Sequence, residues 1–397
     1  MKKMLFLPLL FAFAISVQVA EAQAPDVILI GATISESGRF TPIVGPFGKF
    51  MKNWEAVINE RGGVFVKEFG KKIPVKIIYY DDKSDPATSA KFYERLITVD
   101  KVHILLGPFS SFISYAATTS AEKYGIPMVL AEANDPKLFE RKYKWSVTQL
   151  DVADKDSWNY LDMLKAEGKV KTIAMLAEDT LHTKGVLEGA FKKAKELGFD
   201  VVMKEIAPAG TKDFSPIITR MKALNPDVVF VEAFPAFEIP FAKQAKELGL
   251  KPREFYFGHT TKAFMDAVDP AWMENVVSSP FWVPGQGYDP EGDKVYEEVL
   301  RRTGIKWEDY WESAIHFFSL QTLVKAIEEA GTLDRGKVMD ALWKIRFTGI
   351  SGPIFHHPDG LGSVSTVAAQ IQKGSLVPIW PKEVRERAKS KHIYPRP

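Results

Sequence analysis

A segment near the start of the chain has the glycines and polar groups of a ligand-binding turn. Residues 27–33 are apolar and predict a buried strand, the following turn carries Ser37 and Gly38, and an amphipathic helical pattern then runs to Gly62. Gly31 and Gly38 lack the G-x-G-x-x-G spacing that wraps a dinucleotide pyrophosphate. We therefore expect the turn at Ser37 to hold a ligand smaller than a nucleotide.

Two adjacent serines, Ser110 and Ser111, lie where a predicted strand ends and a helical pattern begins. A helix N-terminus offers free backbone amides and the positive end of the helix dipole, and both favour an anion. Serine at such a place is also an ordinary helix N-cap. The sequence predicts that Ser110 or Ser111 contacts a ligand anion, and the capping role stays open beside it.

Signatures of catalysis and of metal binding are missing from the sequence. It has no cysteine and no G-x-S-x-G, H-E-x-x-H or phosphate-loop pattern. The seven histidines are scattered except for His356 and His357, whose H-H-P-D-G context is typical of a surface turn. We expect no catalytic residue, no metal site and no cofactor. An exported hydrolase is a minor alternative, because a Ser/His/Asp set leaves no compact motif.

The first 24 residues are typical of a cleaved export signal. Lys2 and Lys3 precede an apolar run over residues 4–19, and Ala20-Glu21-Ala22 offers a small-x-small cleavage site. The apolar run is shorter than the roughly 20 residues that span a bilayer. We expect cleavage between residues 22 and 25 and a periplasmic mature protein.

Length and charge restrict the class of protein further. A chain of 397 residues exceeds the roughly 250–300 residues at which single cores stop growing, so two lobes are expected. The formal net charge is only +2. A nearly neutral chain gives no electrostatic reason to expect binding to nucleic acid or to a membrane surface.

Short apolar runs alternate with amphipathic helical patterns, which predicts an α/β fold with parallel sheets. The alternation occurs in two series, before and after Trp145, and this favours two similar lobes. The expected strands are 27–33, 75–80, 102–107, 127–130, 172–177, 201–204, 228–232, 255–258 and 276–283, and the expected later helices are 184–197, 216–224, 236–248, 293–302 and 314–330.

Five segments, in this order and spacing, resemble the branched-chain amino-acid (Leu/Ile/Val-binding) type of periplasmic substrate-binding protein of ABC transporters. They are I-G-A-T-I-S-E-S-G at 30–38, D-D-K-S-D-P at 81–86, H-I-L-L-G-P-F-S-S at 103–111, Y-G-I-P-M-V-L-A-E-A-N-D-P at 124–136, and the stretch 223–250. The similarity spans essentially the whole chain after the export signal.

The resemblance implies a type I periplasmic binding protein fold, in which two Rossmann-like lobes with parallel sheets are joined by three crossover hinges. The implied N-terminal lobe is 25–147 plus 279–350, and the implied C-terminal lobe is 148–278 plus 351–397. The two lobes would close over a small ligand at the carboxyl ends of their strands. The implied partners are this small-molecule ligand and an inner-membrane ABC permease, and the implied state is a monomer.

The resemblance also implies the ligand-binding residues. Ser111 matches the serine that holds a ligand carboxylate, and Ala133 and Asn134 stand where the family usually has a small residue followed by threonine. After strand 255–258 the family commonly has an acid that pairs with a ligand ammonium, whereas this chain has His259-Thr260-Thr261; Glu132 or Glu232 could replace that acid. The expected ligand-binding residues are Ser37, Phe109, Ser110, Ser111, Ala131, Glu132, Ala133, Asn134, His182, Thr183, Phe234, His259 and Thr260.

The expected function is capture of a branched-chain or aromatic amino acid, or a related small carboxylate, for an ABC importer. Because the acidic residue is missing near Thr260, a protein that binds non-amino organic acids, aromatic acids or amides is the first alternative. A ligand-sensing receptor domain is a second alternative, because the same fold serves sensing.

Overall fold

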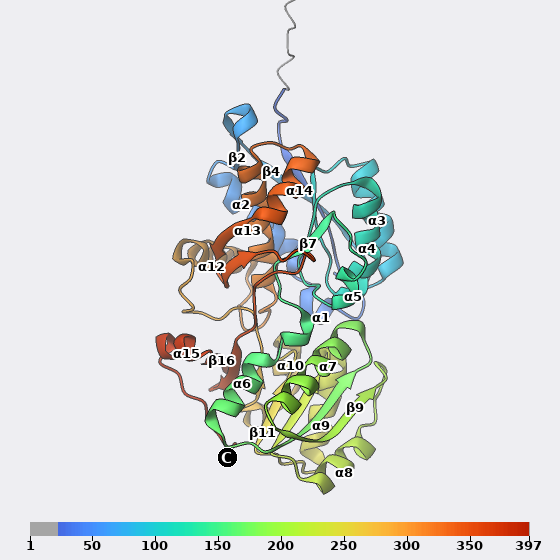
Figure 1. The fold of residues 1–397 in the computed structure, drawn as a ribbon, viewed down its shortest axis with the longest axis vertical. Coiled ribbons are helices and arrows are strands. Elements are labelled where there is room, and N and C mark those ends of the chain that lie inside the picture. Colours follow the sequence, from blue (N-terminus) through green and yellow to red (C-terminus); the bar gives the residue numbers. More distant parts are fainter. Residues whose placement is uncertain (1–22, 397) are drawn as a thin grey trace, which may run out of the picture.

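The computed structural model describes residues 23–396, which form an elongated molecule of two lobes (Figure 1). Residues 1–22 of the expected export signal lie outside the described range. Within residues 23–396, no helix is both long enough and apolar enough to cross a membrane.

The first lobe is built on a five-stranded parallel sheet. Its strand order is β4 (Val75–Asp81), β1 (Ile28–Ile34), β5 (Ile104–Leu106), β6 (Met128–Leu130) and β7 (Ser146–Thr148). The helices α1 (Thr41–Val44), α2 (Phe47–Glu60), α3 (Pro86–Thr98), α4 (Ser111–Tyr124) and α5 (Pro136–Phe139) connect these strands. A short hairpin of β2 (Val64–Val66) and β3 (Lys71–Ile73) precedes β4.

The second lobe is built on a seven-stranded mixed sheet. Its order is β16 (Ser375–Trp380), β15 (Ala368–Gln372), β12 (Val277–Ser278), β11 (Glu254–Phe257), β10 (Val228–Glu232), β8 (Thr172–Glu178) and β9 (Asp200–Ala207). The strands from β12 to β9 are parallel, while β15 and β16 run antiparallel at one edge. Its helices are α6 (Trp158–Glu167), α7 (Leu181–Glu196), α8 (Ser215–Leu224), α9 (Pro235–Glu247), α10 (Lys262–Ala267), α11 (Pro270–Met273) and α15 (Lys382–Ala388).

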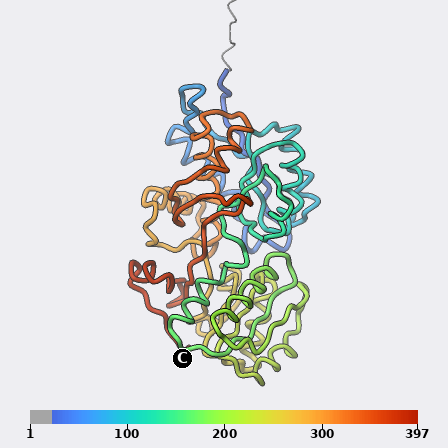
Figure 2. Tube along the Cα trace, viewed as in Figure 1, coloured from blue at the N-terminus to red at the C-terminus, as the bar shows by residue number. Residues whose placement is uncertain are grey.

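The chain passes between the two sheets three times, as the colours of Figure 2 show. It leaves the first sheet after β7 and returns after β12 through α12 (Pro290–Thr303), α13 (Ser313–Ala330) and α14 (Arg335–Lys344). The hairpin β13 (Arg346–Gly349) and β14 (Gly352–Phe355) follows, and the chain then crosses again to β15. The predicted fold, two Rossmann-like lobes joined by three crossovers, is confirmed.

Local sequence signals explain where several of these elements begin and end. The Asp85 carboxylate caps α3 by accepting the Thr88 N–H at 2.7 Å, and Gly125 ends α4 with a φ of +59°. All five residues of β10 are buried, and its first four are apolar, as expected for a central parallel strand. The strand expected over residues 276–283 is much shorter in the structure. Only Val277–Ser278 pairs with neighbouring strands before the chain turns back toward the first lobe.

A partly buried ionic cluster holds the C-terminal tail against the second lobe. His392 lies between Glu167 (2.9 Å) and Glu254 (2.5 Å), and Tyr160 donates its hydroxyl proton to Glu254 at 2.6 Å. Burial by itself would lower the pKa of His392, but the two glutamates overcome it and raise this pKa above its usual value. For Glu167, burial acts to raise the pKa, and the contact with His392 reverses this and lowers it.

We expect His392→Ala to lower the free energy of unfolding by about 3 kcal/mol near pH 6, because two carboxylates lose their shared cation. A histidine whose pKa is higher in the folded state than in the unfolded state stabilises the folded protein. This stabilisation is complete at pH values below the unfolded-state pKa of about 6.5, and it is lost as the pH rises through the folded-state pKa. Denaturant unfolding at pH 6 and pH 9 should therefore give a larger loss at pH 6. The exposed His357→Ala is the control, and an equal loss at both pH values would contradict this assignment.

Candidate functional site

A cavity lies between the two lobes, where carboxyl ends of strands from both sheets face each other. Its wall includes residues directly after β5 and β6 of the first sheet, the last residue of β10 in the second sheet, and residues of the crossing segments. The cavity has a volume of about 50 Å³. One water needs roughly 10–15 Å³, so the cavity in this arrangement of the lobes has room for more than a single water.

Four carboxyl groups line this cavity, and all four are buried. Glu132 follows β6, Asp156 lies in the first crossover, Glu232 ends β10, and Glu312 precedes α13; they are exposed by 8%, 8%, 3% and 1%. Burial raises the pKa of each group above its usual value, that of Glu232 to about 8. None of the lining residues is a lysine or an arginine. The cavity is therefore acidic and lacks a protein cation to balance it.

Two histidines of the second lobe line the cavity without adding positive charge. His182 Nε2 lies 3.9 Å from Asp156, and His259 Nδ1 lies 4.0 Å from Glu232. His259 Nδ1 is also 2.8 Å from the Ala233 carbonyl, so this nitrogen carries the proton and donates it there. Burial lowers the pKa of His182 to about 4 and that of His259 to about 3. Both rings are neutral near pH 7 and offer hydrogen bonds only.

The first turn of α4 is the part of the wall suited to an anion. The Ser110 side chain lines the cavity, and its buried hydroxyl has no hydrogen-bond partner. The Ser111 hydroxyl instead accepts the backbone N–H groups of Asn134 and Asp135, both at 3.3 Å. Of the two serines, Ser110 is thus the one with a free hydroxyl at the cavity, beside the amide end of a 14-residue helix.

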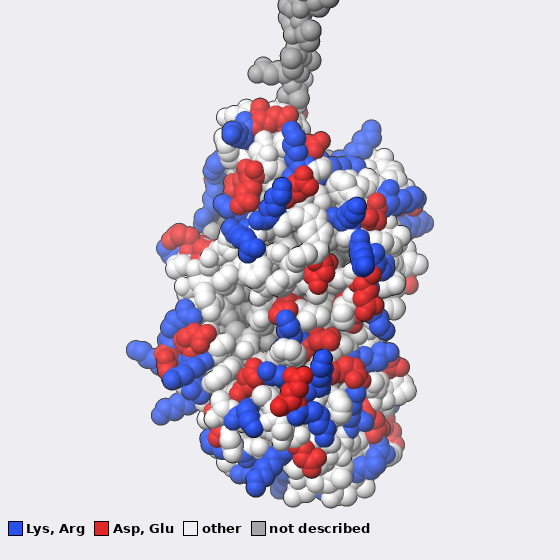
Figure 3. Space-filling model, viewed as in Figure 1, with Lys and Arg blue, Asp and Glu red and all other residues white. Residues whose placement is uncertain are grey.

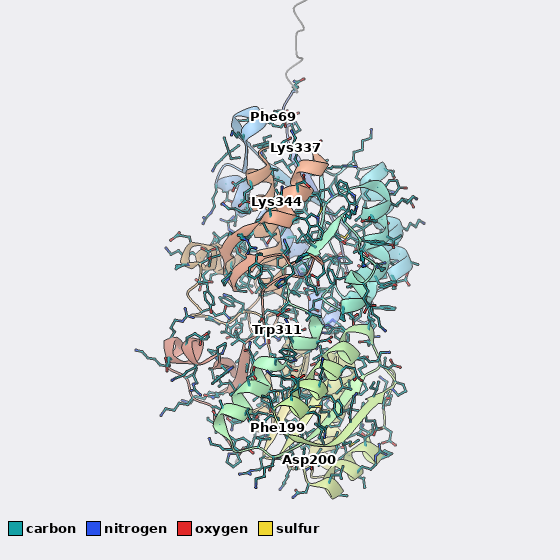
Figure 4. All side chains as sticks on the ribbon, in the orientation of Figure 1. Phe69, Phe199, Asp200, Trp311, Lys337 and Lys344 are labelled. Carbon is teal, nitrogen blue, oxygen red and sulfur yellow. The ribbon has the colours of Figure 1, made fainter. Side chains whose placement is uncertain are left out.

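Aromatic rings form much of the remaining wall. Phe109 and Phe234, which follow strands of opposite lobes, have ring centroids 5.9 Å apart, and Phe40 packs against both. The Trp311 ring stacks against His259 at 5.9 Å, and Figure 4 places Trp311 between the two lobes. Tyr256 and Phe281 complete this group. The rings can pack on apolar parts of a ligand, and their faces can also attract a cation.

The structure brings about half of the expected ligand-binding residues to the cavity. Those that line it are Phe109, Ser110, Glu132, Asn134, His182, Phe234 and His259. The Asn134 side-chain N–H₂ group donates hydrogen bonds within the protein, to the Asp151 carbonyl and to the Asp156 carboxylate.

The other expected residues lie elsewhere for identifiable reasons. Ser37 is exposed, and its hydroxyl donates to Asp81 at 2.6 Å. The Thr183 hydroxyl donates to the Glu178 carbonyl in the first turn of α7. Ser111, Ala131, Ala133 and Thr260 are buried but are not part of the cavity wall.

Several wall residues carry little sequence signal of their role. Asp156 and Thr366 lie in crossing segments, where neither strand nor helix periodicity marks a position. Glu312 and Trp311 precede α13, whose apolar sequence predicts only a buried helix. One usable signal for Glu312 was its place as the acid next to the N-terminus of that long helix.

An ion pair joins the two lobes beside the cavity, where Arg39 lines a neighbouring pocket that shares Ser110, His182 and Phe234 with it. Arg39, from the turn after β1, donates to Glu178 at the end of β8 with a separation of 2.7 Å. Its guanidinium lies over the rings of Phe40 (4.9 Å) and Phe234 (5.7 Å). The buried Glu178 also accepts the Phe234 N–H at 2.9 Å. This contact exists only while the lobes are close together.

Comparison with known proteins identifies relatives over nearly the full length. The family model of periplasmic binding proteins matches residues 27–375. An amino acid binding protein of Pseudomonas aeruginosa is 24% identical over 352 residues, which cover 86% of this chain and 89% of that protein. Leu/Ile/Val-binding protein homolog 6 of Brucella suis is 26% identical over 365 residues, 88% of each chain.

Solved structures share the same fold. A leucine binding protein from Thermotoga maritima aligns with a TM-score of 0.77 and 20% identity, over 89% of this chain and 98% of that chain. A solute binding protein from R. palustris in complex with 4-hydroxybenzoate aligns with a TM-score of 0.73 and 22% identity, over 89% and 95%. At these identities the likeness establishes the fold.

We expect Arg39→Ala to favour a more open arrangement of the two lobes, because Glu178 loses its partner across the gap. Small-angle X-ray scattering should then give a larger radius of gyration than for the unchanged protein. Lys184→Ala is a matched control, since Lys184 pairs with Asp179 of its own lobe at 2.6 Å. Identical scattering from Arg39→Ala and the unchanged protein would show that the ion pair does not hold the lobes together.

Proposed function

Because this chain belongs to the periplasmic binding protein family, we propose that it is the solute-binding component of an ABC importer. In this role it is exported, loses its signal segment, and works as a periplasmic monomer that binds its solute without transforming it. The solute is an amino acid or a related small carboxylate, held in the cavity between the lobes. The partner is the permease of the importer.

The acidic wall of the cavity is the main observation that favours an amino acid as the ligand. A ligand ammonium beside Glu232 would balance a carboxylate that is 3% exposed and has no lysine or arginine within the wall. Burying such a carboxylate without a counter-charge is unfavourable by several kcal/mol. Glu232 thereby takes the place of the acid that the family commonly has after strand β11.

The ligand carboxylate has a separate place at the first turn of α4. The free Ser110 hydroxyl and the helix amides can donate hydrogen bonds to it, and the helix dipole favours its charge. Phe109, Phe234 and Trp311 then pack against the ligand side chain.

Closure of the lobes follows from this division of contacts. Glu232 belongs to the second lobe and Ser110 to the first, so one ligand reaches both only when the lobes are together. Such a ligand selects the closed state by its differential affinity for that state. The permease would then recognise the closed form, in which Arg39 and Glu178 are paired.

A binder of aromatic acids without an amino group is the second candidate. The aromatic wall favours it, and one of the structures with this fold contains 4-hydroxybenzoate. The four buried carboxyl groups oppose it, because a benzoate adds a negative charge and brings no cation. A sensing role of the same binding site is the third candidate, and transport by a reconstituted importer would separate it from import.

A thermal-shift screen of the mature protein should separate these candidates. At a hundredfold excess over its dissociation constant, a ligand stabilises by roughly 2.7 kcal/mol and raises the melting temperature by several degrees. We expect leucine, phenylalanine or other amino acids to do so, and 4-hydroxybenzoate to have little effect. Stabilisation by benzoates alone would contradict the amino-acid assignment.

We expect Glu232→Gln to lower the binding affinity for the amino acid selected by that screen by roughly 30-fold or more. The reason is that a buried charge pair loses one partner. Isothermal titration calorimetry measures this loss directly. Glu247→Gln, an exposed position on α9, is the control. Equal affinities of Glu232→Gln and the unchanged protein would show that Glu232 does not receive the ammonium.

A further inference from the structure

A second pair of acids in the cavity is left without a partner by the proposed amino-acid contacts. Glu132 and Glu312 both come from the first-lobe side of the wall, where Glu132 follows β6 and Glu312 precedes α13. Glu132 is 8% exposed and Glu312 is 1% exposed. Oε1 of Glu132 and both carboxylate oxygens of Glu312 have no hydrogen-bond partner.

The nearest histidine does not balance this pair. His316 Nδ1 lies 2.7 Å from Glu132 Oε1, but the two atoms are not aligned as a hydrogen bond. The His316 ring is fully buried and packs edge-on against Phe47 at 4.7 Å. Burial lowers the pKa of His316 to about 3, so the ring is neutral near pH 7.

The other two acids of the wall come from different elements of the fold. Glu232 ends a strand of the second sheet, and Asp156 lies in the first crossover, where it accepts two hydrogen bonds from Asn134. Glu232 thus comes from the second lobe, whereas Glu132 and Glu312 come from the first-lobe side of the wall. If the only ammonium group of the ligand lies at Glu232, Glu132 and Glu312 receive no cation and stay buried either in protonated form or with an uncompensated charge.

We propose that the ligand is an amino acid whose side chain carries a second cationic nitrogen, which binds between Glu312 and Glu132. This inference rests on the proposed function and narrows its ligand class from amino acids in general to basic amino acids. The α-ammonium remains with Glu232, and the α-carboxylate remains with Ser110 and the first turn of α4. Trp311 adjoins Glu312 in the chain, and its ring can attract the same cation.

Lysine and norleucine form the decisive pair of probes, because they share a linear side chain and differ by the terminal ammonium. We expect calorimetry at pH 7 to give lysine an affinity about tenfold or more higher than that of norleucine. Glu312→Gln should remove this advantage while norleucine binds as well as before or better. Glu247→Gln should keep the advantage, and melting curves of both variants establish that they are folded.

Each other outcome has a definite meaning. Norleucine binding as tightly as lysine would overturn the second cation and leave the amino-acid binding function intact. A diamine without a carboxylate, 1,5-diaminopentane, binding as tightly as lysine would support the second cation and contradict the amino-acid class. Failure of lysine, norleucine and leucine to bind would overturn both proposals. The comparison of lysine with norleucine needs no variant, so a misfolded Glu312→Gln would not affect it.

Discussion

The structure depends on one electrostatic constraint, which is the burial of four carboxyl groups in a cavity without a lysine or arginine. Glu132, Asp156, Glu232 and Glu312 are each less than a tenth exposed. Ionised carboxylates in such surroundings are unfavourable unless a cation accompanies them, and the histidines of the wall are neutral near pH 7. In the closed state these acids are therefore protonated or matched by a cation that comes from outside the chain.

The four acids are buried only while the two lobes are close together. The acids come from both sheets and from a crossover, so separation of the lobes would return them to water, where ionisation is inexpensive. Closure is favoured outside the cavity by the Arg39–Glu178 ion pair and by the contact of Phe40 with Phe234. On the face of the molecule that Figure 3 shows, positive and negative side chains are interspersed, in contrast to the acids of the cavity wall. A cationic ligand then links closure to binding.

Much of the fold was predictable because strands buried on both faces leave unbroken apolar runs. The expected strand 228–232 has the bounds of β10, and its last residue, Glu232, was identified as an acid that could face a ligand. Side-chain direction was less predictable, since adjacent residues such as Ser110 and Ser111 differ only in the local backbone. Asp156 and Glu312 were missed because crossing segments bring them to the cavity, and long-range connections leave no periodic pattern.

A crystal structure of the protein with L-lysine at saturating concentration tests the central claim most directly. The account predicts closed lobes, the α-ammonium within hydrogen-bond distance of Glu232, the α-carboxylate at Ser110, and the side-chain ammonium beside Glu312. A lysine bound outside the interlobe cavity, or one whose carboxylate faces Glu232, would contradict the claim that the buried acids are the cation-binding part of the site.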